Sequence, residues 1–142
     1  MADGFDVFDR TVQKSTEWIR EVCGEMGPPD MQKGYLALRA VLRTLRDRLT
    51  VDEAANLGAQ LPLLIRGIYY DGYRPSRMPV KISTRDQFLT AVKDCLGGAM
   101  PVVPSDEATA AVLTVLQKRI TDGEITDIRN MMPQELQGLW PS

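Results

Sequence analysis

Hydrophobic residues recur along most of the chain at spacings of three, four or seven, the period of a helix that buries one face. In residues 5–26 the stripe consists of Phe8, Val12, Ile19, Val22, Cys23 and Met26. In residues 31–49 it consists of Met31, Tyr35, Leu38, Val41, Leu42, Leu45 and Leu49. The alternation typical of a strand is confined to the short VKI segment at residues 80–82. The pattern predicts an all-α protein.

Residues that start or stop helices bound each predicted helix. Gly27-Pro28-Pro29 ends the first, because proline lacks an amide donor and clashes with the preceding turn. Asp30 and Ser105 are predicted N-caps, and Pro62 and Pro133 each suit a helix start. In a capping box, a threonine hydroxyl accepts the amide three residues on and a Glu or Gln side chain reaches back. Three capping boxes are predicted, at Thr50–Glu53, Thr84–Gln87 and Thr121–Glu124.

The sequence aligns with itself when it is shifted by 71 positions (121 − 50 = 71). Without a gap, the shift superposes Leu45 on Leu116, Thr50 on Thr121, Glu53 on Glu124 and Leu61-Pro62 on Met132-Pro133. The prediction is two homologous bundles of about four short helices each, packed into one globular body. Residues 1–73 form the first helical repeat, 74–83 a linker, and 84–142 the second repeat.

The segment LPLLIRGIYYDGYRP at residues 61–75 places Tyr69, Tyr70 and Tyr73 within two turns. Because the shift of 71 superposes Tyr69 on Trp140, the segment is interpreted as the closing helix of a repeat, with its rings on the core. A tyrosine-rich surface for a partner or ligand is the alternative, since tyrosine suits positions with one apolar and one wet edge.

Arg39, Arg43 and Arg46 follow at i, i+4 and i+7 and form a basic ridge on the second helix. Such a ridge can bind a phosphate-bearing ligand or nucleic acid. It can equally be a solvated helix face, or pair with Asp47 and Asp52.

Acidic residues gather near predicted helix starts, where negative charge stabilises the helix dipole. They are Asp52, Glu53, Asp106, Glu107, Glu124 and Asp127. Metal binding or paired acid–base chemistry is the other interpretation, but the chain contains no calcium-loop motif. We therefore predict no catalytic, cofactor-binding or metal-binding residue.

Composition narrows the classes of function further. The chain contains no histidine, which excludes Ser-His-Asp and Cys-His chemistry and most transition-metal sites. A formal net charge of −2 argues against nucleic acid as a partner. No apolar run approaches the length of a membrane span, and the first residues lack the pattern of a secretory signal, so no membrane partner and a cytoplasmic location are expected. Cys23 and Cys95 are expected to be small buried residues.

Residues 8–141 resemble a bacterial family known as domain-of-unknown-function family 2267. The segments that carry the resemblance are LPLLIRGIYYDG at 61–72 and EITDIRNMMPQELQGLWP at 124–141. Tyr73 departs from the pattern, because tryptophan is expected there in relatives. The resemblance implies an all-helical protein of two related halves, with no assigned reaction, cofactor or catalytic residue. Some members are joined to regulatory modules, so it also implies a stress-associated or regulatory role.

These observations favour a non-catalytic helical binding or assembly module that acts by self-association or by binding a protein partner. The predicted contact residues are Tyr69, Tyr70, Tyr73, Arg39, Arg43 and Arg46. The alternative is a regulatory protein that binds a small anionic ligand between its two halves. An enzyme that works without histidine is a third interpretation.

Overall fold

The structure, a computed structural model, describes residues 5–141, and within that range it contains eight α-helices, one 3₁₀ turn and no strand. The prediction of an all-α protein is confirmed. The VKI segment is an irregular connection in which the Val80 amide donates to the Asp47 carbonyl at 2.8 Å. The elements are α1 (Asp6–Met26), α2 (Met31–Arg48), α3 (Val51–Ala59), α4 (Leu63–Tyr70), η1 (Pro75–Arg77), α5 (Arg85–Leu96), α6 (Ser105–Arg119), α7 (Asp122–Asn130) and α8 (Gln134–Gln137).

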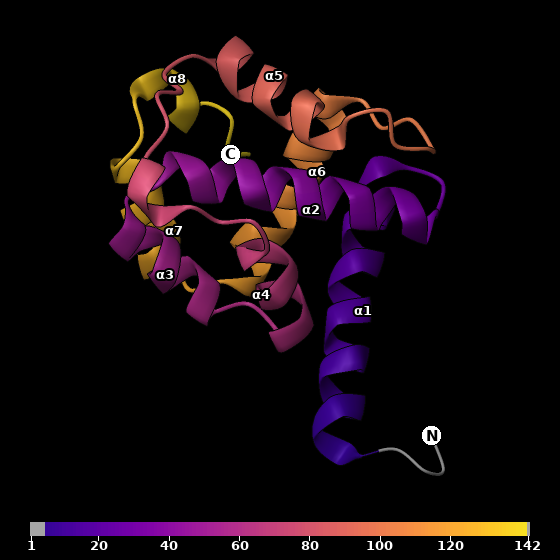
Figure 1. Cartoon of the computed structure of the whole chain (residues 1–142). Helices are drawn as coiled ribbons and strands as arrows, with labels where there is room; N and C mark the ends of the chain where they lie inside the picture. The colour runs from indigo at the N-terminus through magenta and orange to yellow at the C-terminus, as the bar shows by residue number, and fades with distance from the viewer. Residues whose placement is uncertain (1–4, 142) are drawn as a thin grey trace.

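The core lies among α1, α2, α5 and α6 (Figure 1). Helix α2 contacts α1, α5 and α6, and α6 in turn contacts α1 and α5, so the first and last helices share one interior. Both central helices are buried on more than one face, which explains their runs of adjacent apolar residues. The division at residues 74–83 and the duplication itself stay predictions.

Most predicted helix starts agree with the structure. Asp30 Oδ1 accepts the amides of residues 32 and 33 at the start of α2, and Thr84 with Gln87 forms a complete capping box at the start of α5. Ser105 is not a cap: Pro104 holds the N-cap position of α6, with no side-chain hydrogen bond. Cys95 is exposed, contrary to expectation, whereas Cys23 is buried.

Two predicted capping boxes are only half formed. Thr50 and Thr121 do cap α3 and α7, and each hydroxyl accepts the amide of the third helical residue at 3.3 Å. The side chains of Glu53 and Glu124 do not donate or accept at the caps, and they are directed elsewhere. The local sequence therefore predicts the threonine half of each cap correctly, but it does not predict where the glutamate side chain points.

The N-terminal half of α1 is the largest departure from the predicted burial. Phe8 and Val12 are 63% and 52% exposed, although both lie on the apolar stripe. The first turns of α1 extend beyond the rest of the molecule (Figure 1), and although α4 contacts them at Thr11, Phe8 and Val12 stay exposed. Burial of the stripe begins at Ser15 and continues through Trp18 and Val22.

Helices α1 and α2 cross closely at Gly34. A Cβ atom built there would lie 2.7 Å from the Ile19 carbonyl oxygen and 2.9 Å from Cys23 Cβ. Because the first of these is a backbone atom, the two helices would have to separate to admit a methyl group. The absence of a side chain at Gly34 therefore sets the distance between α1 and α2.

We predict that Gly34→Ala destabilises the protein by about 1–3 kcal/mol, the usual cost of overpacking a core. Gly24→Ala is the matched control, because Gly24 lies within α1 with no heavy atom within 4 Å of the new Cβ. It is expected to stabilise by up to about 1 kcal/mol, since alanine favours helix. Urea unfolding measures both, and equal effects of the two substitutions would contradict a close crossing at Gly34.

Candidate functional site

Helices α3 and α7 lie side by side and run in opposite directions. The end of α3 contacts the start of α7, because Gln60 Oε1 accepts the Thr121 amide at 3.1 Å and Gln60 Nε2 donates to the Thr121 hydroxyl at 3.3 Å. The start of α3 contacts the end of α7, because the Thr50 hydroxyl lies 3.5 Å from Met131 Sδ. The two helices are thus held together at both ends.

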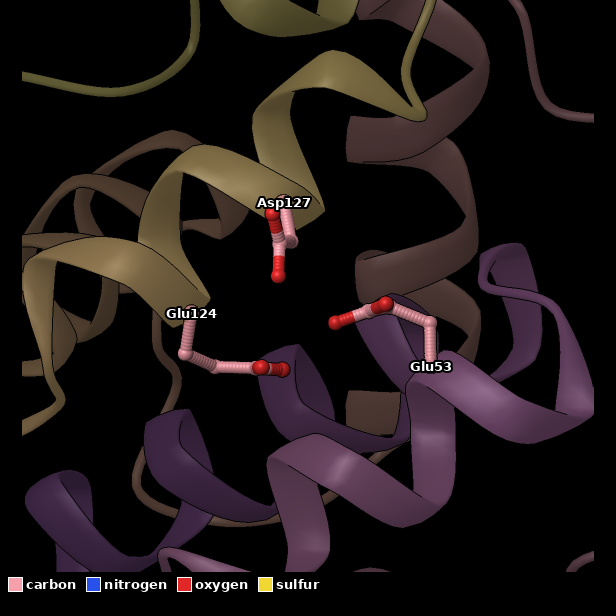
Figure 2. A group of neighbouring side chains, drawn as sticks. All are labelled: Glu53, Glu124 and Asp127. Atoms are coloured by element: carbon pink, nitrogen blue, oxygen red, sulfur yellow. The ribbon is translucent and has the colours of Figure 1, made fainter.

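Between these two contacts, three carboxylates converge in what we call the carboxylate cluster: Glu53 from α3, and Glu124 and Asp127 from α7. Figure 2 shows Glu53 and Glu124 pointing toward one another, with Asp127 beside them. One oxygen from each residue lies within 4.8 Å of the others. Glu53 and Glu124 are only 8% and 7% exposed, whereas Asp127 is open to solvent.

Among the described residues, no side chain of opposite charge pairs with this concentration of negative charge. Within residues 5–141, no arginine or lysine forms an ion pair with Glu53, Glu124 or Asp127. Glu53 Oε1 and Glu124 Oε2 are buried without a hydrogen-bond partner when both groups are carboxylates. Buried charged oxygens in this state are costly, because they have lost water without gaining a donor.

A bound proton relieves part of that cost. Burial, the hydrogen bond that protonated Glu124 can donate to Glu53, and the negative charges of Glu53 and Asp127 together raise the pKa of Glu124 from 4.5 to about 8. The hydrogen bond exists only when Glu124 carries the proton, so deprotonation leaves both buried oxygens without a partner. The carboxylate cluster can therefore hold either a proton or, in its place, a cation that prefers oxygen ligands.

The sequence prediction included these three residues among six acidic residues near helix starts and assigned none of them a site. The structure brings together Glu53 and Glu124, each about half a turn into its helix, and Asp127, about one and a half turns into α7. It leaves the other three, Asp52, Asp106 and Glu107, exposed in first turns, as the helix-dipole interpretation expects.

The tyrosines of residues 69–73 lie at the end of α4. Tyr69 is fully buried and its hydroxyl donates to the Ala54 carbonyl at 2.7 Å, so it closes the space between α4 and α3. Burial, the largest cause, raises the pKa of the Tyr69 hydroxyl above its ordinary value. Tyr70 packs edge-on against Tyr69 and is 36% exposed, and the Tyr73 ring lies beneath Arg46.

The predicted arginine ridge is occupied by contacts within the chain. Arg46 is buried and donates to the carbonyls of Tyr69 at 2.7 Å and Asp71 at 3.0 Å. Arg43 donates to the Ile68 carbonyl at 3.0 Å, so the two side chains cap the C-terminus of α4. Arg39 lies over the ring of Tyr35, on the same helix. A role of these arginines and of the tyrosines in binding a partner stays a prediction.

A second surface feature is an apolar groove between α1 and α4, with a volume of about 340 Å³. Val7 and Leu63 line it and are 50% and 52% exposed, with Leu64 beside them at 45%. The Leu64 amide donates to the Thr11 hydroxyl at 3.4 Å and fixes α4 against α1. A neighbouring hollow of about 330 Å³ includes Lys14 and Arg119.

We predict that the stability of the metal-free protein falls as the pH rises from about 4.5 to about 8. The pKa of Glu124 is higher in the folded chain, about 8, than its ordinary value of 4.5, so the folded state keeps a proton that the unfolded state loses. The resulting stability is fully present below pH 4.5 and is lost above pH 8, at a rate of at most about 1.4 kcal/mol per pH unit.

Glu124→Gln mimics the protonated side chain at every pH. The variant is expected to lose most of this slope and to exceed the natural protein in stability above pH 8. Glu107→Gln removes one exposed first-turn charge and should keep the slope. Urea unfolding at several pH values with chelator present measures the effect, and parallel profiles for the natural chain and Glu124→Gln would refute it.

Comparison with known proteins identifies a family and leaves the chemistry of the carboxylate cluster unassigned. Among residues 5–141, no helix is both long enough and apolar enough to cross a membrane. No curated protein matches the chain. Residues 15–139, which include α2–α8 and the carboxylate cluster, match the model of a family described as "Uncharacterized conserved protein (DUF2267)". The protein belongs to this family of uncharacterised conserved proteins, DUF2267.

Proposed function

We propose that the protein is a non-catalytic assembly module that self-associates through the projecting start of α1 and the apolar groove beside it. The observation that carries the proposal is the exposure of large apolar side chains at the start of α1: the N-cap residue Phe5, and Phe8 and Val12 within the helix, are 63%, 63% and 52% exposed. Exposed apolar groups in one contiguous patch are uncommon on a monomer and mark interaction sites.

The projecting segment, residues 6–14, has no counterpart at the start of α5 when the two helices are aligned. Helix α1 has 21 residues and α5 has 12. With Trp18 matched to Phe88, a shift of 70 positions, Ser15 is level with Arg85, the first residue of α5. The family match also begins at residue 15. The apolar stripe nevertheless continues through this segment. Because the rest of the chain leaves these residues exposed, they are available to pack against another molecule.

A second copy of the chain is the occupant that fits best. Each copy carries both a projecting pair of rings, Phe5 and Phe8 in edge-to-face contact, and an apolar groove next to them. A two-fold arrangement satisfies both surfaces at once, because each copy inserts its rings into the groove of the other. The segment carries Asp6, Asp9, Arg10 and Lys14, which sum to zero charge, so two copies do not repel each other there.

A small anionic ligand is the second candidate function, and the hollow with Lys14 and Arg119 favours it. The hollow lies where α1 and the α3–α4 connection meet the end of α6. Arg119, however, already binds Glu21 through Nε at 3.1 Å. Among the described residues that line this hollow, Lys14 is therefore the one cation that can pair fully with an anion. For this reason the ligand-binding function is the weaker candidate.

We predict that the natural chain dimerises and that Phe5→Ser with Phe8→Ser weakens dimerisation by at least about tenfold, as expected for central aromatic contacts. The matched control is Met100→Ser with Val102→Ser, which removes apolar side chains that are 74% and 68% exposed in the loop before α6. Sedimentation velocity across a concentration series measures the association constant, and circular dichroism verifies helicity.

A monomer at all concentrations, or equal weakening by the control pair, would contradict assembly through α1. Native mass spectrometry of the protein from its own source separates the two candidates. A dimer mass without added mass supports assembly, whereas a monomer that retains a small anion supports the ligand-binding function.

A further inference from the structure

We propose that Glu53, Glu124 and Asp127 bind one divalent cation of the size of Ca²⁺ between α3 and α7. This site is separate from the α1–α4 surface and goes beyond the proposed assembly function. It is built on oxygen ligands alone, which the hard cations Ca²⁺, Mg²⁺ and Mn²⁺ prefer.

The first support is the state of the buried oxygens. Glu53 and Glu124 are each more than nine-tenths buried, and the side chains point at each other (Figure 2). Glu53 Oε1 and Glu124 Oε2 have no donor from the described part of the chain. Two buried acceptors that converge without a hydrogen-bond donor can both be satisfied by one cation placed between them.

The second support is the spacing. The three candidate ligand atoms lie within 4.8 Å of one another. Ca²⁺ binds oxygen at about 2.3–2.6 Å, so a single ion can bridge oxygens up to about 4.6–5.2 Å apart. Mg²⁺ binds at about 2.0–2.1 Å, bridges at most about 4.2 Å and demands near-octahedral geometry, so the larger and geometrically more tolerant Ca²⁺ accommodates a wider range of spacings below the 4.8 Å bound.

The third support is access. Asp127 is exposed and forms the solvent side of the carboxylate cluster, while Glu53 and Glu124 form its buried floor. An ion can enter past Asp127 and keep water molecules on that side, because Ca²⁺ takes six to eight ligands and three carboxylates do not fill its shell. Across residues 5–141, no lysine or arginine lies within ion-pairing distance of the three carboxylates, so no protein cation competes with the ion.

The position that corresponds to Asp127 under the 71-residue shift is Asn56, on α3 (127 − 71 = 56). Asn56 follows Glu53 by three residues, as Asp127 follows Glu124, so the two pairs occupy equivalent positions on one face of each helix. An asparagine side-chain oxygen is also an acceptable ligand for Ca²⁺. Asn56→Asp is consequently a gain-of-affinity variant for this site.

The site has a mechanical consequence, because its ligands come from both helices. Helices α3 and α7 are otherwise joined at their ends by hydrogen bonds that involve Gln60, Thr121 and Thr50. An ion between Glu53 and Glu124 would replace repulsion with attraction at the middle of this contact. Bound Ca²⁺ is therefore expected to raise the melting temperature of the protein.

The test is calorimetric titration of chelator-treated full-length protein with CaCl₂ at pH 7.5, with MgCl₂ in a parallel series. We expect one Ca²⁺ per chain, and weaker binding of Mg²⁺. Glu53→Gln, Glu124→Gln and Asp127→Asn should each weaken Ca²⁺ binding by at least about tenfold, because loss of even an outer-shell partner costs this much. Asn56→Asp should strengthen it.

Asp52→Asn and Asp122→Asn are the matched controls. Each removes one exposed charge from the first turn of the same helix, α3 or α7, without touching the carboxylate cluster. Their Ca²⁺ affinity should stay within about twofold of that of the natural chain. Circular dichroism checks that every variant folds, and the Gln and Asn variants keep the shape of the original side chains.

Three results would overturn the proposal. The first is no Ca²⁺ binding by the folded natural protein, which would leave the cluster as a proton-sharing pair. The second is equal weakening in the control variants, which would indicate diffuse attraction to a negative surface. The third is unchanged affinity in both Glu53→Gln and Glu124→Gln. None of these results bears on dimerisation, which the Phe5 and Phe8 variants test separately.

Discussion

The packing of α2 against α6 is the interaction on which the rest of the structure depends. Each of these helices supplies a run of buried side chains, and together they join the first and last four helices into one core. Helix α3 begins only three residues after α2 ends, and α7 begins three residues after α6 ends (51 − 48 and 122 − 119). With connections this short, pairing of α2 with α6 also brings α3 beside α7. The contact between Glu53 and Glu124 thus follows from the core.

The contact between Glu53 and Glu124 lowers the stability of the fold, and a different residue at either position would remove this effect. Glutamine at either position would fit the same space without a charge, and a buried pair of like charges destabilises the fold unless it is neutralised. Positions where a sequence departs from the choice that stability favours are frequent at functional sites. Stability does not account for two buried carboxylates in contact, so a functional role is the better explanation for the residues of the carboxylate cluster. Its two possible occupants, a proton or a cation, would each link the stability of the α3–α7 contact to conditions outside the protein.

Helical periodicity and capping residues were sufficient to predict the fold class and most helix boundaries, because both depend on neighbours in sequence. The same reasoning identified Tyr69 as a core residue. It failed at Phe8 and Val12, since an apolar stripe shows that a face can be covered and does not show what covers it. The exposed stripe is now the basis of the proposed dimer contact.

The capping-box pattern failed at Glu53 and Glu124 for a related reason. The local sequence there has the same form as the box at Thr84, yet Gln87 reaches back to the cap and the two glutamates do not. Glu53 and Glu124, which are 71 residues apart, face each other instead of reaching back to their caps. This pairing is visible only in the three-dimensional structure. A signal was nevertheless present, because the 71-residue shift superposes Glu53 on Glu124, and the predicted duplication gives the two residues equivalent places.

A double-mutant cycle of Glu53→Gln and Glu124→Gln tests most directly whether these carboxylates oppose one another across α3 and α7. The free energy of unfolding of the four proteins would be measured at pH 9 in metal-free buffer, where the unneutralised pair is most costly. We expect either single substitution to remove most of the repulsion, so the double variant should gain less than the sum of the two by at least about 1 kcal/mol. Additivity within about 0.3–0.5 kcal/mol would show that the two side chains do not interact, and would contradict this expectation.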